Sequence, residues 1–258
     1  HHTVVLRLMI RFDKVTKQLG GRNVLDELSF EIQKGEIFTI VGPSGTGKSV
    51  TLKHMVRLLT PTRGSVWIDG TEISAANGSG LDRVRERFGY LFQGGALLGW
   101  MSVAENIALP LREKTRLTED EIGARVTDAL RAVGLEGDGG KFPSEISGGM
   151  QKRAGLARAI VNRPEIVLYD EPTSGLDPVT ARTIDQLIKR LNEELGITSV
   201  VVSHDLQGAL LIADRIAMLT GGKFVEVSPP EKFVATAQPD VRSFLDAQFI
   251  SKKGLAGM

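Results

Sequence analysis

The sequence predicts an α/β protein with a mixed sheet core, an antiparallel β part near its N-terminus and an inserted helical part. Three observations support this fold class. Short β-rich runs broken by glycine come first, a helical pattern occupies residues 102–135, and apolar strands then alternate with helices from residue 149 onward. Alternating strands and helices favour a largely parallel sheet, and a helical block between two α/β parts favours a second lobe.

The N-terminal part has the pattern of β structure. Val4–Val15 and Val24–Ile32 are expected to be antiparallel strands joined by a turn at Gly20-Gly21. The run Ile37–Val41 is apolar and β-branched, as expected of a buried strand. The other elements expected in this part are a helix over 50–59 and a strand over 65–68.

The middle of the chain is predicted to be helical. Glu119–Val133 has the strongest helical pattern, Thr118 and Glu121 resemble a capping box at its start, and Gly134 is placed to end it. A short apolar helix pattern also covers 241–249. The remaining expected elements are helices over 149–161, 179–195 and 206–213 and strands over 166–169, 198–203 and 216–220.

These elements predict a single domain over residues 3–250. Its core is expected over 3–93 and 143–235, with the antiparallel β part included, and its helical subdomain over 94–142. Residues 236–258 are expected to form a C-terminal extension.

Composition excludes several classes of site. Lys and Arg total 32 and Asp and Glu total 31, so the net charge of +1 predicts no nucleic-acid partner. The chain has no cysteine, which excludes disulfides, thiolate metal sites and cysteine nucleophiles. No apolar run of about 18 residues exists and the N-terminus lacks a signal-peptide pattern, so no transmembrane helix is expected. His1-His2 are interpreted as the end of an expression tag.

A glycine-rich loop indicates nucleotide binding. Gly42 and Gly47-Lys48-Ser49 match the phosphate-loop pattern of P-loop NTPases, between a predicted buried strand and a predicted helix. Glycines let the backbone N–H groups converge on a phosphate, and the helix adds its positive N-terminal end. A ligand-free turn is the alternative, but the strand–loop–helix context argues against it. The residues expected to bind ATP here are Gly42, Pro43, Ser44, Gly45, Thr46, Gly47, Lys48, Ser49 and Thr51.

Two carboxylates follow another predicted strand. Asp170 and Glu171 come directly after the apolar run Ile166–Tyr169. A carboxylate at the carboxyl end of a parallel strand is suited to hold Mg²⁺, and the next one to polarise the attacking water. Alone, the pair would more often cap the next helix, but together with a phosphate loop it supplies the missing metal ligand and base.

Four further motifs resemble those of ABC ATPases. Ser147–Gln151 resembles their signature, Leu-Ser-Gly-Gly-Gln, with Ile146 and Met150 in the places of Leu and Gln. Asp177, His204 and Gln93 match the D-loop, the switch histidine and the Q-loop glutamine. The resemblance covers nearly the whole chain and keeps the motif order. It implies an ATP hydrolase with catalytic Glu171, His204, Gln93 and Lys48, metal ligands Ser49, Gln93 and Asp170, and further nucleotide contacts from Ser147, Gly148, Gly149 and Asp177.

The resemblance also implies a mechanism and a departure from it. Two copies are expected to dimerise head to tail, with the signature of one copy closing on the γ-phosphate held by the other. The family often stacks adenine on an aromatic residue, whereas the matching position here is Leu19. We therefore expect apolar packing of the base against Leu19 and Val24.

Segments near the Q-loop and signature resemble ATPases of Mla- and MCE-type phospholipid transporters. They are Leu91–Leu97, Asn106–Glu113 and Met150–Ala159. The resemblance implies phospholipid transport through a separate permease, with the ATPase peripheral on the cytoplasmic face of the inner cell membrane. An MCE-domain protein and a small regulatory subunit are further candidate partners.

The run Ala96–Met101 is apolar and contains Trp100, so we expect it to dock the permease. The alternative is that it packs inside the helical lobe. Two other functions stay open: an ABC transporter ATPase for another substrate, such as an amino acid or a lipoprotein, and a soluble non-transport ABC ATPase. A P-loop kinase is the weakest alternative, because the signature and switch histidine have no purpose there.

Overall fold

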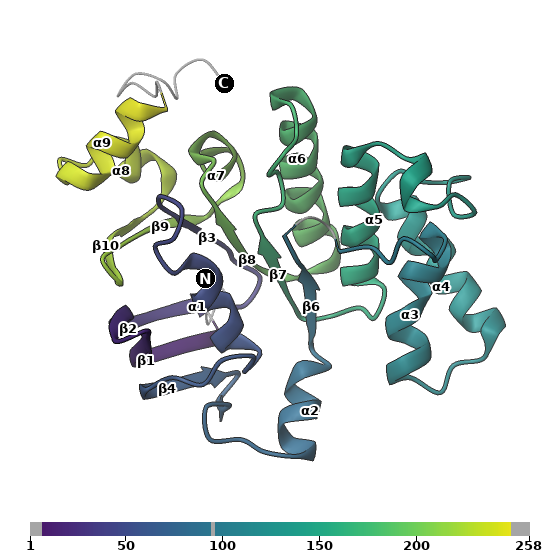
Figure 1. Cartoon of the computed structure of the whole chain (residues 1–258), viewed down its shortest axis with the longest axis horizontal. Helices are drawn as coiled ribbons and strands as arrows, with labels where there is room; N and C mark the ends of the chain where they lie inside the picture. The colour runs from purple at the N-terminus through teal and green to yellow at the C-terminus, as the bar shows by residue number, and fades with distance from the viewer. Residues whose placement is uncertain (1–6, 94–95, 249–258) are drawn as a thin grey trace, which may run out of the picture. The chain divides into compact units, whose positions relative to one another are not determined.

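The structure is a computed structural model that describes residues 7–93 and 96–248. Its contacts divide the chain into two compact units, one formed by 1–85 with 198–258 and the other by 86–197. Unit 1 and unit 2 denote these two parts below, and Figure 1 labels their elements. Each unit combines strands with helices, which confirms the predicted α/β class.

Unit 1 contains the predicted antiparallel sheet. Its strand order is β2-β1-β4-β5, and β1 pairs antiparallel with both β2 and β4. Gly20 and Gly21 have positive φ angles of 56° and 78° at the tight turn between the first two strands, as predicted. The strands are β1 (Leu8–Leu19), β2 (Arg22–Gln33), β4 (Arg63–Ile68) and β5 (Thr71–Glu72). Val4, where the first strand was expected to begin, lies outside the described residues.

A second group of strands in unit 1 is of mixed direction. β3 (Ile37–Val41) runs parallel to β8 (Thr198–Ser203) and to β9 (Arg215–Thr220), whereas β10 (Lys223–Ser228) pairs antiparallel with β9. All five residues of β3 are buried, as expected for a β-branched strand with neighbours on both sides. The predicted mixed sheet core is thereby confirmed.

The helices of unit 1 flank these strands. The last two lie against β10 (Figure 1), and their apolar residues join a cluster that includes Val41, the residue before the glycine loop. The helix predicted over 241–249 runs from Pro239 to Ala247, and Phe249 lies outside the described residues. The helices are α1 (Lys48–Met55), α2 (Ser79–Arg85), α7 (Leu206–Ile212), α8 (Pro230–Ala235) and α9 (Pro239–Ala247).

Helix α1 ends at Met55, four residues before the predicted end at Leu59. Arg57 has a left-handed φ of 51°, which the helix cannot continue through. Arg85 donates 3.0 Å hydrogen bonds to the carbonyl oxygens of Val56 and Arg57. A side chain distant in sequence thus provides the hydrogen bonds that these carbonyl oxygens would otherwise lack at the end of the helix. The prediction that the helix continues to Leu59 was wrong, because the backbone turns at Arg57.

Unit 2 contains one parallel strand pair and the predicted helices. β6 (Phe88–Leu91) runs parallel to β7 (Ile166–Asp170), and α5 packs closely on β6, since a Cβ on Gly89 would lie 2.1 Å from the carbonyl oxygen of Ala159. Thr118 and Glu121 form the predicted capping box. The helices are α3 (Val103–Lys114), α4 (Glu119–Ala132), the 3₁₀ turn Pro143–Glu145, α5 (Gly148–Ile160) and α6 (Pro178–Leu195).

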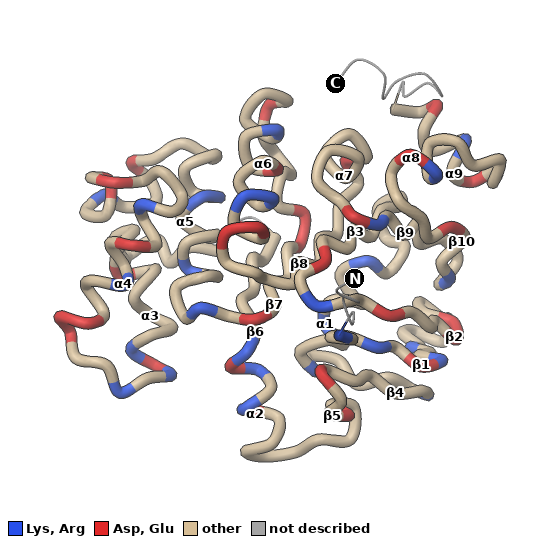
Figure 2. The backbone as a smooth tube through the Cα atoms, turned by 180° about the vertical axis from the view of Figure 1, so that it is seen from behind, with Lys and Arg blue, Asp and Glu red and all other residues tan. Residues whose placement is uncertain are grey.

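Acidic and basic residues intersperse along the described backbone of both units (Figure 2). This pattern agrees with a net charge of +1. Among the described residues, none of the helices combines the length and the apolar character needed to cross a bilayer.

Candidate functional site

The glycine loop of unit 1 joins the end of β3 to the start of α1. Gly42, Gly45 and Gly47 have φ angles of 151°, 79° and 99°. Only glycine adopts such angles without strain, so the loop curls as the sequence pattern predicts. The first turn of α1 begins directly after Gly47, which points the free N–H groups of the helix into the loop.

Two of these glycines also lie too close to neighbours for any side chain. A Cβ on Gly42 would lie 2.5 Å from the carbonyl oxygen of Leu219, and one on Gly47 would lie 3.0 Å from Val24. Val24, one of the two residues expected to pack against the base, therefore lies against the loop. Leu19 lies at the end of β1 and is 44% exposed.

Lys48 is buried and reaches back over the loop. Its Nζ atom donates 2.9 Å hydrogen bonds to the carbonyl oxygens of Gly42 and Pro43. Thr46 donates to Pro43 O, and Thr51 donates to Gly47 O at 3.1 Å, which braces the loop from both ends. Ser49 lies in the first turn of α1. An ammonium group within a glycine cradle at a helix N-terminus fits a phosphate group.

His204 follows β8 in the same unit and its side chain is exposed. Asp205 caps α7 by accepting a hydrogen bond from Gly208 N at 3.2 Å. The histidine therefore lies at the carboxyl end of a strand that pairs with β3, the strand leading into the glycine loop.

The two carboxylates lie in unit 2 at the end of β7. Asp170 is 6% exposed and Glu171 is 9% exposed, so both are withdrawn from water. Glu171 has a left-handed φ of 51°, which costs a non-glycine residue about 1 kcal/mol or more. Strain of this kind persists only where surrounding contacts maintain it, and it often marks a functional residue.

Lys152 of α5 supplies such contacts and was not identified from the sequence. Its buried Nζ atom lies 3.4 Å from both the carbonyl oxygen of Glu171 and the hydroxyl of Ser174. Burial lowers the pKa of Lys152, while the charges of Glu171 and Asp170 act in the opposite direction. The detectable signal was a lysine two residues before the apolar run Ala154–Ala157, on a face that must be buried.

Aromatic residues precede the predicted Q-loop glutamine. The rings of Tyr90 and Phe92 stack with centroids 4.1 Å apart. Burial, together with the charge of Asp170, raises the pKa of the Tyr90 hydroxyl, so it stays neutral. Gln93 itself is exposed. Gly94 and Gly95, which belong to the resemblance at this loop, lie outside the described residues.

The signature residues begin α5. Ser147 is the N-cap and its Oγ atom accepts a hydrogen bond from Met150 N at 3.2 Å. Gly149 is buried, and a Cβ there would lie 2.7 Å from Thr180 Cγ2, whereas one on Gly148 would lie 3.6 Å from Leu176. Gly149 thus permits close packing of α5 against the start of α6.

Asp177 caps α6. Its Oδ1 atom accepts hydrogen bonds from Val179 N at 3.1 Å and Thr180 N at 3.0 Å. Hydrogen bonds from the side chain and backbone of Thr180 hold the pKa of Asp177 below its ordinary value. The predicted signature and D-loop residues therefore start two helices that pack together in unit 2.

The apolar segment Ala96–Met101, which follows the Q-loop, is partly exposed and is held by a buried side chain. Trp100 is 75% exposed. The side chain of Asn106, fully buried, accepts from Leu98 N at 2.7 Å and donates to the carbonyl oxygens of Leu98, Met101 and Ser102 at 3.0–3.1 Å. Asn106 was noticed in the sequence only as part of a resemblance, and its anchoring role was missed.

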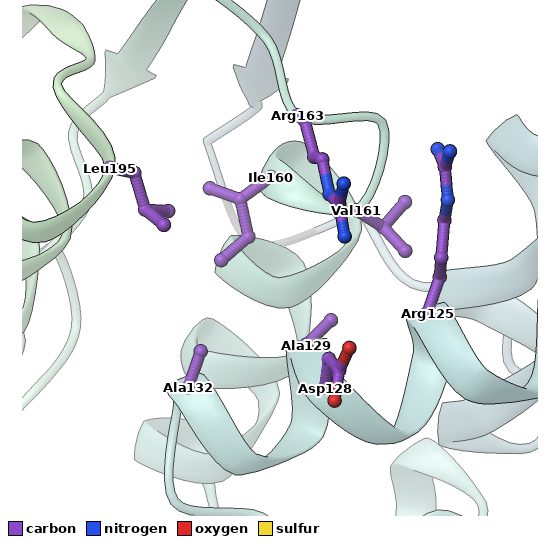
Figure 3. A pocket seen from close by; sticks show the side chains of 8 residues that line it. All are labelled: Arg125, Asp128, Ala129, Ala132, Ile160, Val161, Arg163 and Leu195. Atoms are coloured by element: carbon purple, nitrogen blue, oxygen red, sulfur yellow. The ribbon is translucent and has the colours of Figure 1, made fainter.

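Unit 2 also has a cavity of about 250 Å³ away from these motifs (Figure 3). Arg125 of α4 and Arg163, which follows α5, border an apolar floor. The lining residues are Arg125, Asp128, Ala129, Ala132, Ile160, Val161, Arg163 and Leu195.

The structure thus gathers the predicted residues into two groups. Unit 1 brings together the glycine loop, Lys48 and Val24, with His204 at the end of a strand beside β3. Unit 2 brings together Asp170, Glu171 and Lys152 at the end of β7 and the signature with Asp177 at the starts of α5 and α6. Gln93 follows β6, the strand paired with β7.

Comparisons with known proteins agree with these motifs. A family model described as ABC transporter matches residues 25–174. The chain is 45% identical over 242 residues to a probable ribonucleotide transport ATP-binding protein, mkl, of Mycobacterium leprae, covering 94% of this chain and 70% of the relative. It is 41% identical over 240 residues to the intermembrane phospholipid transport system ATP-binding protein MlaF of Haemophilus influenzae, covering 93% of this chain and 91% of that protein.

A solved structure agrees as well. The dimeric, post-hydrolysis state of the ATP-binding cassette MJ0796 bound to ADP and Pi is 36% identical to this chain with a TM-score of 0.78, covering 86% of this chain and 99% of that one. The chain therefore belongs to the ABC transporter family, as an ATP-binding subunit that hydrolyses ATP.

Proposed function

We propose that this chain powers phospholipid transport through a separate membrane permease. The observation that carries the ATP-driven part of the proposal is the buried Lys48, held at 2.9 Å from Gly42 O and Pro43 O beside glycines whose Cβ positions are closed by neighbours. This arrangement suits the β- and γ-phosphates of ATP. Val24, packed on Gly47, and Leu19 would provide an apolar surface for the base.

Hydrolysis would use the carboxylates and polar groups of the other motifs. Ser49, Gln93 and Asp170 would hold Mg²⁺, which when bound neutralises phosphate charge. Glu171 would accept a proton from the attacking water, from its buried position directly after β7. His204 would contact the γ-phosphate from the end of β8 and stabilise developing charge there.

Two copies of the chain would act together. Ser147, Gly148 and Gly149 form a helix N-terminus suited to an anion, and in the proposed head-to-tail dimer they and Asp177 contact nucleotide held by the other copy. The dimeric state of the cassette MJ0796 supports a dimer of this chain. Binding of ATP would then favour the closed dimer, and loss of the γ-phosphate would favour the open one.

The segment Ala96–Met101 would dock the permease. Its Trp100 is 75% exposed while Asn106 holds the backbone around it, and an exposed aromatic on a fixed loop is typical of an interface anchor. The chain would then be peripheral on the cytoplasmic face of the cell membrane. An MCE-domain protein and a small regulatory subunit are proposed as further partners, on the basis of the resemblance to MlaF.

The transported substrate is proposed from the relatives. MlaF of Haemophilus influenzae supports phospholipid, and mkl of Mycobacterium leprae supports ribonucleotide as a second candidate. Purification of the intact membrane complex, followed by lipid and nucleotide mass spectrometry, separates the two. Co-purifying phospholipid supports the first substrate. Its absence, together with ribonucleotide bound in excess of the ATP and ADP held at the proposed nucleotide sites, contradicts it.

Glu171→Gln tests the mechanism directly. The amide cannot accept the proton, so we expect kcat to fall at least about 100-fold while ATP still binds. The variant should accumulate as an ATP-dependent dimer, measured by size-exclusion chromatography with light scattering. Turnover close to that of the unaltered chain would remove Glu171 from the role of base, and a monomer at saturating ATP would contradict dimer closure.

A further inference from the structure

One side chain at the end of the C-terminal helix α9 forms two hydrogen bonds to the segment of His204. The carboxamide of Gln248 donates from Nε2 to the carbonyl oxygen of His204 at 2.8 Å and accepts at Oε1 from Leu206 N at 2.9 Å. The nitrogen and the oxygen of one side-chain amide thus bond to backbone groups of residues two positions apart. The bridge spans 42–44 positions of sequence.

Gln248 is itself held in place. It is the C-cap of α9, and its own N–H points back to the carbonyl oxygens of that helix. Val241 and Leu245 of α9 are fully buried in a cluster with Leu206 and Leu210 of α7. Because the backbone of Gln248 is fixed by this packed helix, the hydrogen bonds of its side chain can restrain the groups that they reach.

The bridged segment is the turn between β8 and α7. Ser203 Oγ accepts from Asp205 N at 2.9 Å, and Asp205 caps α7. The first helical amide, Leu206 N, is one of the amides that a helix cannot satisfy internally. Gln248 accepts from this amide and donates to the carbonyl oxygen of His204. These two hydrogen bonds restrain the backbone from which the His204 side chain projects.

We propose that Gln248 is a positioning residue for ATP hydrolysis, which acts by setting the orientation of His204. The C-terminal helix is then a control element, because any partner that shifts α9 also releases the turn that carries His204. This inference rests on the role of His204 in the proposed function. A displacement of about 1 Å in a catalytic group is enough to slow a reaction substantially.

The test compares the same substitution at the two ends of α9. Gln248→Met keeps the size of the side chain and removes both hydrogen bonds to the turn. Gln238→Met is the matched control, since Gln238 Oε1 caps the start of α9 through Val241 N at 2.9 Å and makes no bond to the turn in the described structure. Both variants lose a helix-end contact, but only one touches the segment of His204.

We expect Gln248→Met to lower kcat about five- to tenfold and to change KM for ATP less than twofold. Gln238→Met should keep kcat within about twofold. Hydrogen exchange followed by mass spectrometry should show faster exchange over residues 204–212 in Gln248→Met alone, a readout that stays available if turnover is too low to measure. Equal kcat values in the two variants, or unchanged exchange over 204–212, would overturn the proposal.

The double variant Gln248→Met/His204→Ala separates this inference from the proposed function. If Gln248 acts through His204, its substitution lowers kcat no further once the imidazole is gone. A full additional loss in the His204→Ala background would overturn the inference and leave the role of His204 intact. Normal turnover of His204→Ala alone would instead remove His204 from the proposed mechanism, and the positioning role of Gln248 with it.

Discussion

The Nζ atom of Lys152 lies 3.4 Å from the carbonyl oxygen of Glu171, a residue whose backbone has the left-handed φ of 51°. The lysine also reaches Ser174 Oγ, whose hydroxyl donates to the same carbonyl at 3.0 Å. A buried cation and a hydroxyl thus converge on the backbone of the proposed base. This contact explains how a strained turn can persist at the end of β7.

Lys152→Met is expected to lower kcat about 10- to 100-fold, because the backbone of Glu171 relaxes and the carboxylate moves away from its working position. Stability should change by less than about 2 kcal/mol, since removing a buried charge offsets the lost hydrogen bonds. Steady-state ATPase kinetics and urea unfolding measure the two effects. Lys189→Met, the same change at an exposed position of α6, is the control, and an equal kcat in both variants would refute the role of Lys152.

Gly149→Ala is expected to destabilise the protein by about 1–3 kcal/mol, because its Cβ would lie 2.7 Å from Thr180 Cγ2 and force α5 away from α6. Urea unfolding measures this change. Gly148→Ala, with 3.6 Å to Leu176, should cost about 0.5 kcal/mol or less. Thr180→Ser removes the obstructing methyl group, so the double variant Gly149→Ala/Thr180→Ser should recover most of the stability that Gly149→Ala loses. If the stability does not recover, this clash is not the cause of the loss.

Features encoded in adjacent residues were predictable from the sequence. β3, the glycine loop and the start of α1 follow one another within 37–48, and each has its own local pattern. The capping box at Thr118 and Glu121 is likewise a signal four residues long. In these places, backbone conformation and residue type determine each other without help from distant contacts.

Features that depend on distant partners were not predictable. Lys152 and Asn106 are polar residues whose burial follows from tertiary packing, and their contacts to Glu171 and to the loop at Leu98 appear only in the folded chain. The early end of α1 depends on Arg85, 28–29 positions away.

Gly42→Ala is expected to lower ATP affinity more than about 100-fold and to destabilise the protein by about 2–4 kcal/mol. The added Cβ would meet the backbone oxygen of Leu219 at 2.5 Å, and backbone atoms cannot rotate away as a side chain can. Gly45→Ala has open space around its Cβ, so it should incur only the conformational cost of a positive φ, about 1 kcal/mol. Isothermal titration with ATP and thermal unfolding compare the two variants, and equal losses would contradict the close approach at Gly42.

Asn106→Ala tests whether the loop around Trp100 must be rigid to bind the permease. The change deletes one hydrogen bond to Leu98 N and three to carbonyl oxygens, so we expect a loss of stability of about 2–4 kcal/mol and weaker co-purification with the permease. ATP hydrolysis by the isolated chain should persist, because none of these groups belongs to the proposed nucleotide site.

Asn162→Ala is the matched control, since Asn162 Oδ1 is buried but accepts no hydrogen bond in the described part of the chain. It should cost less than Asn106→Ala and leave co-purification unchanged. Trp100→Ala removes the exposed ring without disturbing the loop, and it should weaken co-purification with little loss of stability, because a side chain that is 75% exposed contributes little to the folded core. If Trp100→Ala co-purifies normally while Asn106→Ala does not, the loop backbone rather than the tryptophan ring makes the contact.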